Sequence, residues 1–226
     1  MTAQLTLPWE WTPVYNEESF FVAPNNQEAY QALCKNSETL TPGTLFLWGE
    51  KSCGKTHLAH IWASKTRALF LRKEDLSPLS LLESHPQAST YVLEDIQNLK
   101  DETGLFHLLN LIKEHQSQLL ITSRVSASCL PFTLPDLCSR LRALTSLAIT
   151  LPDQNSASAF LYKRFADMHM KPPKGFVEHI LTRAPRTYAD LDHLTRQIWD
   201  ASLKQKRRPS TSLLKEILEE RGLVAS

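Results

Sequence analysis

The chain is poor in glycine and cysteine and carries almost no net charge. Its 226 residues include six glycines and four cysteines, and 25 basic side chains are balanced by 24 acidic ones. The cysteines form no CxxC pair and are too sparse for a disulfide scaffold, which favours a reducing compartment. The near-zero charge argues against a dedicated polyanion binder. No stretch approaches the length of a membrane span, so none is expected.

Apolar residues, in contrast, make up 42% of the chain, which is enough for a sizeable core and excludes disorder as the main state. The first nine residues lack the basic and apolar stretches of a secretion signal. We therefore expect a folded cytoplasmic protein.

Short apolar segments alternate with amphipathic ones over the first two thirds of the chain. Continuous apolar runs of this length are typical of buried parallel strands. The pattern predicts strands at residues 44–48, 68–71, 90–93, 119–122 and 147–151, and helices at residues 55–65, 102–115 and 136–144. Such alternation predicts an α/β fold, a parallel sheet with helices on both faces.

After residue 152 the strand pattern stops. Helical patterns at residues 155–169, 176–183, 188–204 and 211–221 are separated by prolines, which end helices. We expect a tail at residues 1–15, an α/β domain at 16–152 and a small all-helical domain at 153–226.

Residues 49–56 (GEKSCGKT) match the phosphate-binding pattern G-x-x-x-x-G-K-[ST] in full. The motif follows an expected strand and opens an expected helix, the context that this pattern requires. Loop N–H groups and the helix N-terminus would face phosphate oxygens. Lys55 would reach the β- and γ-phosphates, and the Thr56 hydroxyl would bind Mg²⁺. The residues expected at the nucleotide here are Gly49, Glu50, Lys51, Ser52, Cys53, Gly54, Lys55, Thr56 and His57.

Two carboxylates, Glu94 and Asp95, follow the strand expected at residues 90–93. A P-loop needs an acid on a neighbouring strand to hold Mg²⁺, directly or through water. We assign Glu94 to the metal and Asp95 to an attacking water, although the spacing leaves the two roles exchangeable. Ser123, at the end of the strand expected at 119–122, is placed to sense the γ-phosphate.

Together these motifs resemble the DnaA/Hda family of AAA+ proteins. Residues 54–58 (GKTHL) and 94–97 (EDIQ) look like segments of the bacterial replication initiator DnaA. Residues 21–29 (FVAPNNQEA) resemble the segment that borders the adenine pocket in that family, which implies nucleotide contacts for Val22 and Asn26. The resemblance implies ATP or ADP with Mg²⁺ as cofactors and an AAA+ sheet domain followed by a helical lid.

Two arginines acquire roles from the resemblance. Residues 134–141 (LPDLCSRL) are similar to a segment of the Hda branch, in which the matching arginine is a finger that acts on nucleotide in a neighbouring subunit. The resemblance therefore implies a catalytic role in trans for Arg140. Arg186 and Thr187 look like the start of the sensor-2 helix, so Arg186 would contact phosphate from the lid.

Residues 4–8 (QLTLP) resemble the peptide with which the Hda branch docks on the DNA polymerase sliding clamp. An extended tail would insert Leu5 and Leu7 into an apolar groove while hydrogen bonds hold Gln4. Pro8 would limit the entropy of the free tail. The implied partners are the clamp β subunit and the DnaA initiator, and self-association is left open.

The sequence thus predicts an AAA+ nucleotide switch that regulates replication initiation, with weak or partner-dependent ATPase activity at most. The chain ends after the lid helices, so no sequence-specific DNA binding is expected. Glu94 stands where most relatives have Asp, and residues 122–125 (TSRV) lack the family's Asp-Arg-Pro-Pro continuation. A helicase-loader-type AAA+ ATPase acting on the replicative helicase is the alternative, and an adaptor that keeps nucleotide without hydrolysing it stays open.

The tail motif leads to the first prediction. Wild-type protein should bind the sliding clamp of its own species with micromolar or tighter affinity, and the double substitution Gln4→Ala/Leu7→Ala should abolish binding, because it removes a hydrogen-bonding group and an apolar anchor. Calorimetry with the purified clamp measures both. Absence of wild-type binding, with or without ADP, would instead favour the helicase-loader reading.

Overall fold

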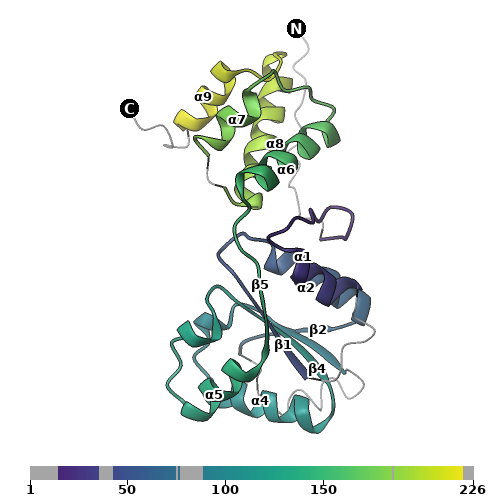
Figure 1. The fold of residues 1–226 in the computed structure, drawn as a ribbon, viewed down its shortest axis with the longest axis vertical. Helices are drawn as coiled ribbons and strands as arrows, with labels where there is room; N and C mark the ends of the chain where they lie inside the picture. The colour runs from purple at the N-terminus through teal and green to yellow at the C-terminus, as the bar shows by residue number, and fades with distance from the viewer. Residues whose placement is uncertain (1–14, 36–42, 75, 77–88, 185, 221–226) are drawn as a thin grey trace.

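The computed structural model describes residues 15–35, 43–74, 76, 89–184 and 186–220. A parallel sheet with flanking helices is followed by a bundle of helices (Figure 1). The predicted clamp-binding motif, which contains Gln4, Leu5, Leu7 and Pro8, lies outside the described residues. Within the described ranges, no helix combines the length and the apolar character needed to cross a membrane.

The sheet has five strands in the order β2-β3-β4-β1-β5, and every pairing is parallel. The strands are β1 (Gly43–Trp48), β2 (Leu69–Leu71), β3 (Thr90–Leu93), β4 (Gln118–Ser123) and β5 (Thr145–Ala148). The predicted α/β class is therefore confirmed. The last strand occupies 145–148 rather than the predicted 147–151, because after Ile149, whose N–H still bonds the Trp48 carbonyl at 2.8 Å, the chain leaves the sheet toward the helical bundle.

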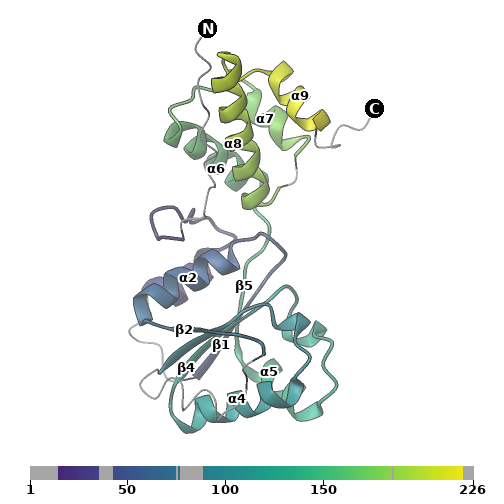
Figure 2. The ribbon, with the colours of Figure 1, turned by 180° about the vertical axis from the view of Figure 1, so that it is seen from behind.

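Helices cover both faces of the sheet, as Figure 2 shows from behind. One face carries α1 (Gln27–Tyr30), the π-helical turn η1 (Gln31–Lys35) and α2 (Lys55–Thr66). The other face carries α4 (Glu102–Glu114) and α5 (Pro135–Ala143). The short 3₁₀ turns are η3 (Ile96–Asn98) and η4 (Ala127–Cys129). The helical turns at residues 27–35 were not predicted, since this segment is too short to show a clear helical period.

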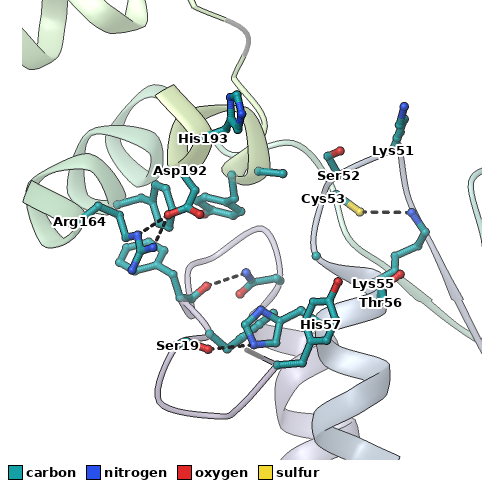
Figure 3. Close-up of a pocket in the computed structure, with 18 of the residues that line it drawn as sticks. Ser19, Lys51, Ser52, Cys53, Lys55, Thr56, His57, Arg164, Asp192 and His193 are labelled. Carbon is teal, nitrogen blue, oxygen red and sulfur yellow. Dashed lines mark hydrogen bonds and ion pairs between the residues drawn. The ribbon is translucent and has the colours of Figure 1, made fainter. Parts of the chain in front are cut away.

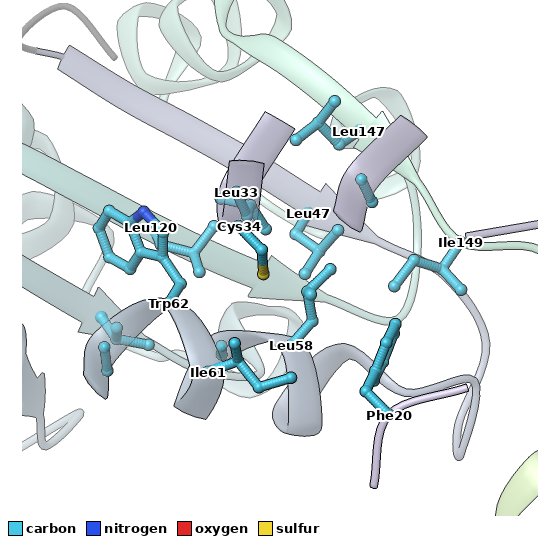
Figure 4. Close-up of a cluster of buried hydrophobic side chains, with 14 of the residues drawn as sticks. Phe20, Leu33, Cys34, Leu47, Leu58, Ile61, Trp62, Leu120, Leu147 and Ile149 are labelled. Atoms are coloured by element: carbon cyan, nitrogen blue, oxygen red, sulfur yellow. The ribbon is translucent and has the colours of Figure 1, made fainter. Parts of the chain in front are cut away.

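The core on the α2 face is built from strand residues whose side chains meet the helix (Figure 4). Leu47 and Leu120 point from β1 and β4 toward Leu58 and Trp62 of α2, and all four are almost fully buried. Because both faces of a parallel sheet are covered, its strands are apolar at consecutive positions. Because side chains on both faces are packed against helices, the position at which each strand ends is fixed. The positions of the loops that follow are fixed with it.

Four helices follow β5 and pack around their own apolar core. They are α6 (Gln154–Asp167), α7 (Phe176–Leu181), α8 (Tyr188–Gln205) and α9 (Thr211–Glu220). The side chain of Asp153 caps α6 by accepting the Ser156 N–H at 2.7 Å, and Thr187 caps α8 in the same way for Asp190 at 3.1 Å. Such caps satisfy N–H groups that have no partner within the helix.

The packing of the sheet predicts a contrast between two phenylalanines. Phe46 is fully buried on β1, whereas Phe70 on β2 is 40% exposed. Phe46→Ala should lower the free energy of unfolding by about 3–5 kcal/mol, because it leaves a cavity under α4 and α5. Phe70→Ala should cost about 1 kcal/mol or less. Urea unfolding of both variants measures the difference, and equal losses would contradict this account of the core.

Candidate nucleotide-binding site

The loop at residues 49–54 leaves β1 at the carboxyl edge of the sheet and leads into α2. The Gly49 N–H donates to the Ser123 carbonyl at 3.2 Å, which ties the loop to β4. A Cβ at Gly49 would lie 2.1 Å from the Ile149 carbonyl oxygen and 2.9 Å from Cys53 Sγ. Gly54 precedes α2 with φ at 109°, a left-handed conformation that favours glycine. Both glycines of the motif are therefore needed to shape the loop.

Lys55 is buried inside this loop rather than extended into solvent. Its Nζ donates to the carbonyls of Gly49 and Glu50, each at 2.8 Å, and lies 3.8 Å from Cys53 Sγ (Figure 3). Burial raises the pKa of the Cys53 thiol, and the neighbouring ammonium opposes that rise only in part. The loop thus encloses one cation and a neutral thiol, and its carbonyls hold the ammonium where phosphate oxygens could replace them.

A cavity of about 630 Å³ lies between the P-loop, the segment at residues 15–26 and the helices α6 and α8. This volume is in the range of small-molecule sites. Of the predicted nucleotide contacts, the structure brings six consecutive P-loop residues, the histidine that follows them and one asparagine to its lining. They are Lys51, Ser52, Cys53, Gly54, Lys55, Thr56, His57 and Asn26. Gly49 and Glu50 lie behind the lining, as backbone partners of Lys55.

Aromatic rings form the apolar wall of the cavity. The Phe21 ring lies edge-on to Phe160 of α6, with centroids 5.5 Å apart, and Tyr188 of α8 lies 5.0 Å from Phe160. The Tyr188 hydroxyl donates to Asn25 Oδ1 at 2.9 Å, and burial raises the pKa of this phenol to about 12. Residues from both parts of the fold thus offer the flat apolar surface that a nucleobase needs.

His57 also lines the cavity. Its ring meets Phe20 edge-on at 5.1 Å, and its Nε2 lies 2.9 Å from the Asn16 carbonyl. That acceptor assigns the proton to Nε2, and burial lowers the pKa of the imidazole. His57 therefore adds a neutral ring to the cavity.

The two predicted base contacts, Asn26 and Val22, differ in position, and only Asn26 lines the cavity. Asn26 is buried, and its side chain accepts the Ala23 N–H at 2.9 Å and donates to the Phe21 carbonyl at 2.9 Å, so it shapes the segment from within. Val22 is 41% exposed and is not among the described residues that line the cavity. Phe20 and Phe21 line it instead, because the bend held by Asn26 turns Val22 outward.

Asp95 and Glu94 differ in their surroundings. Asp95 lines the cavity, whereas Glu94 lies one step behind it with a buried Oε1 that has no hydrogen-bond partner among the described residues. A buried carboxylate oxygen without a donor is costly unless a cation or water reaches it. Thr56 is exposed and lines the cavity.

The side chains of Thr56, Glu94 and Asp95 are suited to an Mg²⁺ ion that binds together with phosphates. Within the described part of the chain, no cluster of three or more His, Cys, Asp or Glu side chains could hold a metal by itself. Mg²⁺ usually keeps several waters and binds one or two carboxylates plus substrate phosphates. Thr56 and the unpartnered Glu94 oxygen would be suitable ligands for such an ion, and the choice between Glu94 and Asp95 stays a prediction.

A hydrogen-bonded network that sequence reasoning missed surrounds Asp95. Its N–H donates to Thr122 Oγ1 at 3.0 Å, and Gln97 Nε2 donates to its Oδ1 at 3.1 Å. The Gln97 Oε1 accepts the Arg124 N–H at 3.0 Å, and Arg124 Nη2 lies 3.6 Å from Asp95 Oδ2. The available signal was positional, because polar residues that follow adjacent parallel strands meet at one edge of the sheet.

Ser123 is not placed as predicted. It is fully buried, its Oγ accepts the Val125 N–H at 3.1 Å, and it is not among the described residues that line the cavity. Alternation along β4 turns Ser123 away from the side on which Thr122 meets Asp95. Arg124, the next residue, reaches the cavity instead.

Arg186 also differs from its predicted position. It is exposed, precedes the N-cap of α8 and does not belong to the described lining. The arginines that α6 and α8 contribute are Arg164 and Arg196, and both are paired with Asp192. Arg164 Nε donates to it at 2.6 Å and Arg196 Nε at 2.8 Å. In α8 the cavity-facing residues lie one helical turn apart, and Arg186 lies before the first turn.

Arg140 lies at the other end of the strands. It is exposed in the last turn of α5, donates to Asn110 Oδ1 and sits 4.5 Å from the centroid of the Phe106 ring. It lines a second cavity of about 670 Å³ together with Gly43, the first residue of β1. The P-loop leaves the opposite end of that strand, roughly 17 Å away for six residues. Arg140 therefore lies at the opposite end of β1 from the P-loop cavity.

Comparison with known proteins relates the sequence to DnaA. No model of a known protein family matches the chain. An uncharacterised protein of Haemophilus influenzae is 33% identical over 153 residues, which cover 62% of this chain and 66% of that protein. The chromosomal replication initiator protein DnaA of Borreliella afzelii is 25% identical over 204 residues, which cover 79% of this chain and 42% of the initiator. The chain therefore spans less than half of this initiator's length.

Solved structures show the same fold. Domain III of the Thermotoga maritima replication initiation protein DnaA superposes with a TM-score of 0.77 at 18% identity, covering 92% of this chain and 97% of that domain. AMPPCP-bound DnaA from Aquifex aeolicus gives a TM-score of 0.74 at 18% identity, covering 93% and 71%. At identities this low, the comparison shows a shared fold alone. That fold agrees with the predicted AAA+ sheet domain followed by a helical lid.

The tight approach at Gly49 yields a prediction. Gly49→Ala would push a methyl group against the Ile149 carbonyl, so we expect a loss of about 1–3 kcal/mol of stability and weaker nucleotide binding. Gly175→Ala is the control, because φ there is 79° but a Cβ meets nothing within 4 Å. It should cost about 1–2 kcal/mol without changing nucleotide affinity. Calorimetry with ADP separates the two, and equal affinities would contradict the assigned site.

Proposed function

We propose that the chain, which is similar in sequence to DnaA initiators and shares the fold of DnaA domain III, is a nucleotide-dependent regulator of replication initiation of the Hda type. It binds ATP or ADP with Mg²⁺ in the P-loop cavity. It docks on the DNA polymerase sliding clamp through residues 4–8 and presents Arg140 to the nucleotide of a DnaA protomer. The support is the sequence relationship to DnaA initiators, the fold shared with DnaA domain III, and the placement of Arg140.

In the P-loop cavity, each residue has a defined task. Lys55 exchanges the carbonyls of Gly49 and Glu50 for phosphate oxygens, and the loop N–H groups and the start of α2 add further positive potential. Bound Mg²⁺ would neutralise phosphate charge. Thr56 and Glu94 would hold that ion, and Asp95 would accept a proton from water. Arg186 would reach phosphate only after the helical bundle turns toward the sheet.

The base and the helical bundle are coupled through the aromatic wall. Phe160 and Tyr188 come from α6 and α8, whereas Phe21 comes from the segment before α1. A base among these rings touches both parts of the fold, so its binding favours one relative orientation of the two. This is the basis for a nucleotide switch.

The position of Arg140 is the observation that carries the trans role. An exposed arginine at the amino ends of the strands lies away from the phosphate site of its own chain, which is at their carboxyl ends. Its guanidinium is nevertheless held in one place by Asn110 and Phe106. A guanidinium supplied in trans is worth roughly 10³–10⁵ in the rate of phosphoryl transfer. The chemistry would therefore occur mainly on the partner.

The test is the substitution Arg140→Ala in the full chain. The variant should keep nucleotide and clamp binding, because Arg140 does not line the P-loop cavity and is not part of the motif at residues 4–8. It should lose the stimulation of ATP hydrolysis by DnaA in the presence of the DNA-loaded clamp, so that turnover falls to the level seen without the protein. Phosphate release by ATP-loaded DnaA measures this.

Arg142→Ala provides the matched control. Arg142 is an exposed arginine of the same helical turn, and its substitution should leave stimulation unchanged. Normal stimulation by Arg140→Ala, or equal loss in both variants, would refute the finger.

A further inference from the structure

We propose that Arg124 is the residue that distinguishes ATP from ADP in this chain, by exchanging the Asp95 carboxylate for the γ-phosphate. The proposal rests on the proposed nucleotide-binding function of the P-loop cavity. It assigns a specificity-determining role to a residue that motif reasoning passed over, and it takes the sensing role from Ser123.

The topology places Arg124 at the correct end of the site. β4 lies between β3 and β1, so the residue that follows it sits between Asp95, which follows β3, and the P-loop, which follows β1. Ligands of open parallel sheets bind at this carboxyl edge. Lys55 and Thr56 bring the terminal phosphates to the edge, and Arg124 lines the same cavity. The γ-phosphate is the part of ATP nearest to this position.

The present partner of Arg124 is easily displaced. Its Nη2 lies 3.6 Å from Asp95 Oδ2, and the two side chains are 43% and 37% exposed. Ion pairs at this exposure contribute little to stability. A phosphate offers more charge and accepts two parallel hydrogen bonds from a guanidinium. The exchange of carboxylate for phosphate is therefore favourable.

The backbone of Arg124, in contrast, is fixed. The Gln97 side-chain amide bridges the two residues, donating to Asp95 Oδ1 at 3.1 Å and accepting the Arg124 N–H at 3.0 Å. Thr122 Oγ1 holds the Asp95 N–H from the other side. The guanidinium can thus change partner without movement of the strand ends. One residue, Gln97, keeps the carboxylate and the arginine in register.

The other cavity arginines are less suited to this task. Among the described lining residues they are Arg164 and Arg196, and Asp192 accepts hydrogen bonds from both. Their side chains are only 19% and 24% exposed. Moving either one would strip a partly buried carboxylate of a partner, which is costly. Moving Arg124 away from Asp95 costs less free energy, because both side chains of that pair are more exposed.

The exchange has a consequence for Asp95. With ADP, Arg124 stays beside Asp95 Oδ2 and occupies the oxygen that would face a water. With ATP, the guanidinium moves to the γ-phosphate and leaves that oxygen free, while Gln97 still holds the other oxygen. The same movement thus reads the nucleotide and exposes the proton acceptor.

The experiment compares the affinity for ADP with that for AMPPCP, by calorimetry on the full chain with Mg²⁺. Arg124→Gln removes the charge at similar length, and Arg124→Lys keeps the charge without the planar fork. For Arg124→Gln we expect AMPPCP to bind about tenfold or more weakly, with ADP within about twofold of wild type. Arg124→Lys should lie between. Arg142 is an exposed arginine away from the cavity, so Arg142→Ala should bind both nucleotides with wild-type affinity.

Each result decides the proposal. An unchanged ratio of the two affinities in Arg124→Gln overturns it, and so does an equal loss for both nucleotides, which would mean a structural role. If Arg124→Gln unfolds, the ratio in Arg124→Lys decides in the same way. Lys55→Ala separates the two levels of the argument. Wild-type binding that is absent, or unaffected by Lys55→Ala, refutes the proposed nucleotide site itself and Arg124 with it.

Discussion

The parallel pairing of β1 with both β4 and β5 is the constraint on which the rest of the structure depends. Its main-chain hydrogen bonds set where the P-loop begins, and the Gly49 N–H adds one more bond to the end of β4. Because β3 pairs with β4 in register, Asp95 and Arg124 arrive at the same edge. The Ile149 carbonyl then closes against Gly49 on the other side. One ladder thus positions loop, acid and arginine together.

Several charged side chains at this edge of the sheet interact with other groups of the same chain, and a bound ligand can replace those groups. Lys55 is held by two carbonyls, and Arg124 faces a half-exposed carboxylate. The Glu94 oxygen has no partner among the described residues. Charged groups arranged in this way would need little reorganisation to receive a phosphate and a metal ion. The arginines on α6 and α8, Arg164 and Arg196, differ, because both are hydrogen-bonded to Asp192 within the helical bundle.

The two ends of the sheet carry different chemistry. The carboxyl ends hold the P-loop cavity, and the amino end of β1 adjoins the second cavity, beside Arg140. A protein with these two surfaces can bind nucleotide in one place and present a guanidinium to a partner in another. The strands β1 and β5 connect the P-loop, the end of α5 and the helical bundle, so both surfaces are built on the same pair of strands.

The sequence by itself determined the parallel sheet, the P-loop and the helices after residue 152, because these depend on local patterns of apolar residues, glycines and prolines. It also predicted Asp95 at the P-loop site, and Asp95 lines the same cavity as the P-loop residues. Tertiary structure alone decided that Ser123 is buried, that Arg186 stands outside the cavity and that Arg124 faces Asp95. These outcomes depend on how strand ends and helix faces meet in space. Side chains distant in sequence become neighbours only when the sheet sets their register and the helices set their rotation.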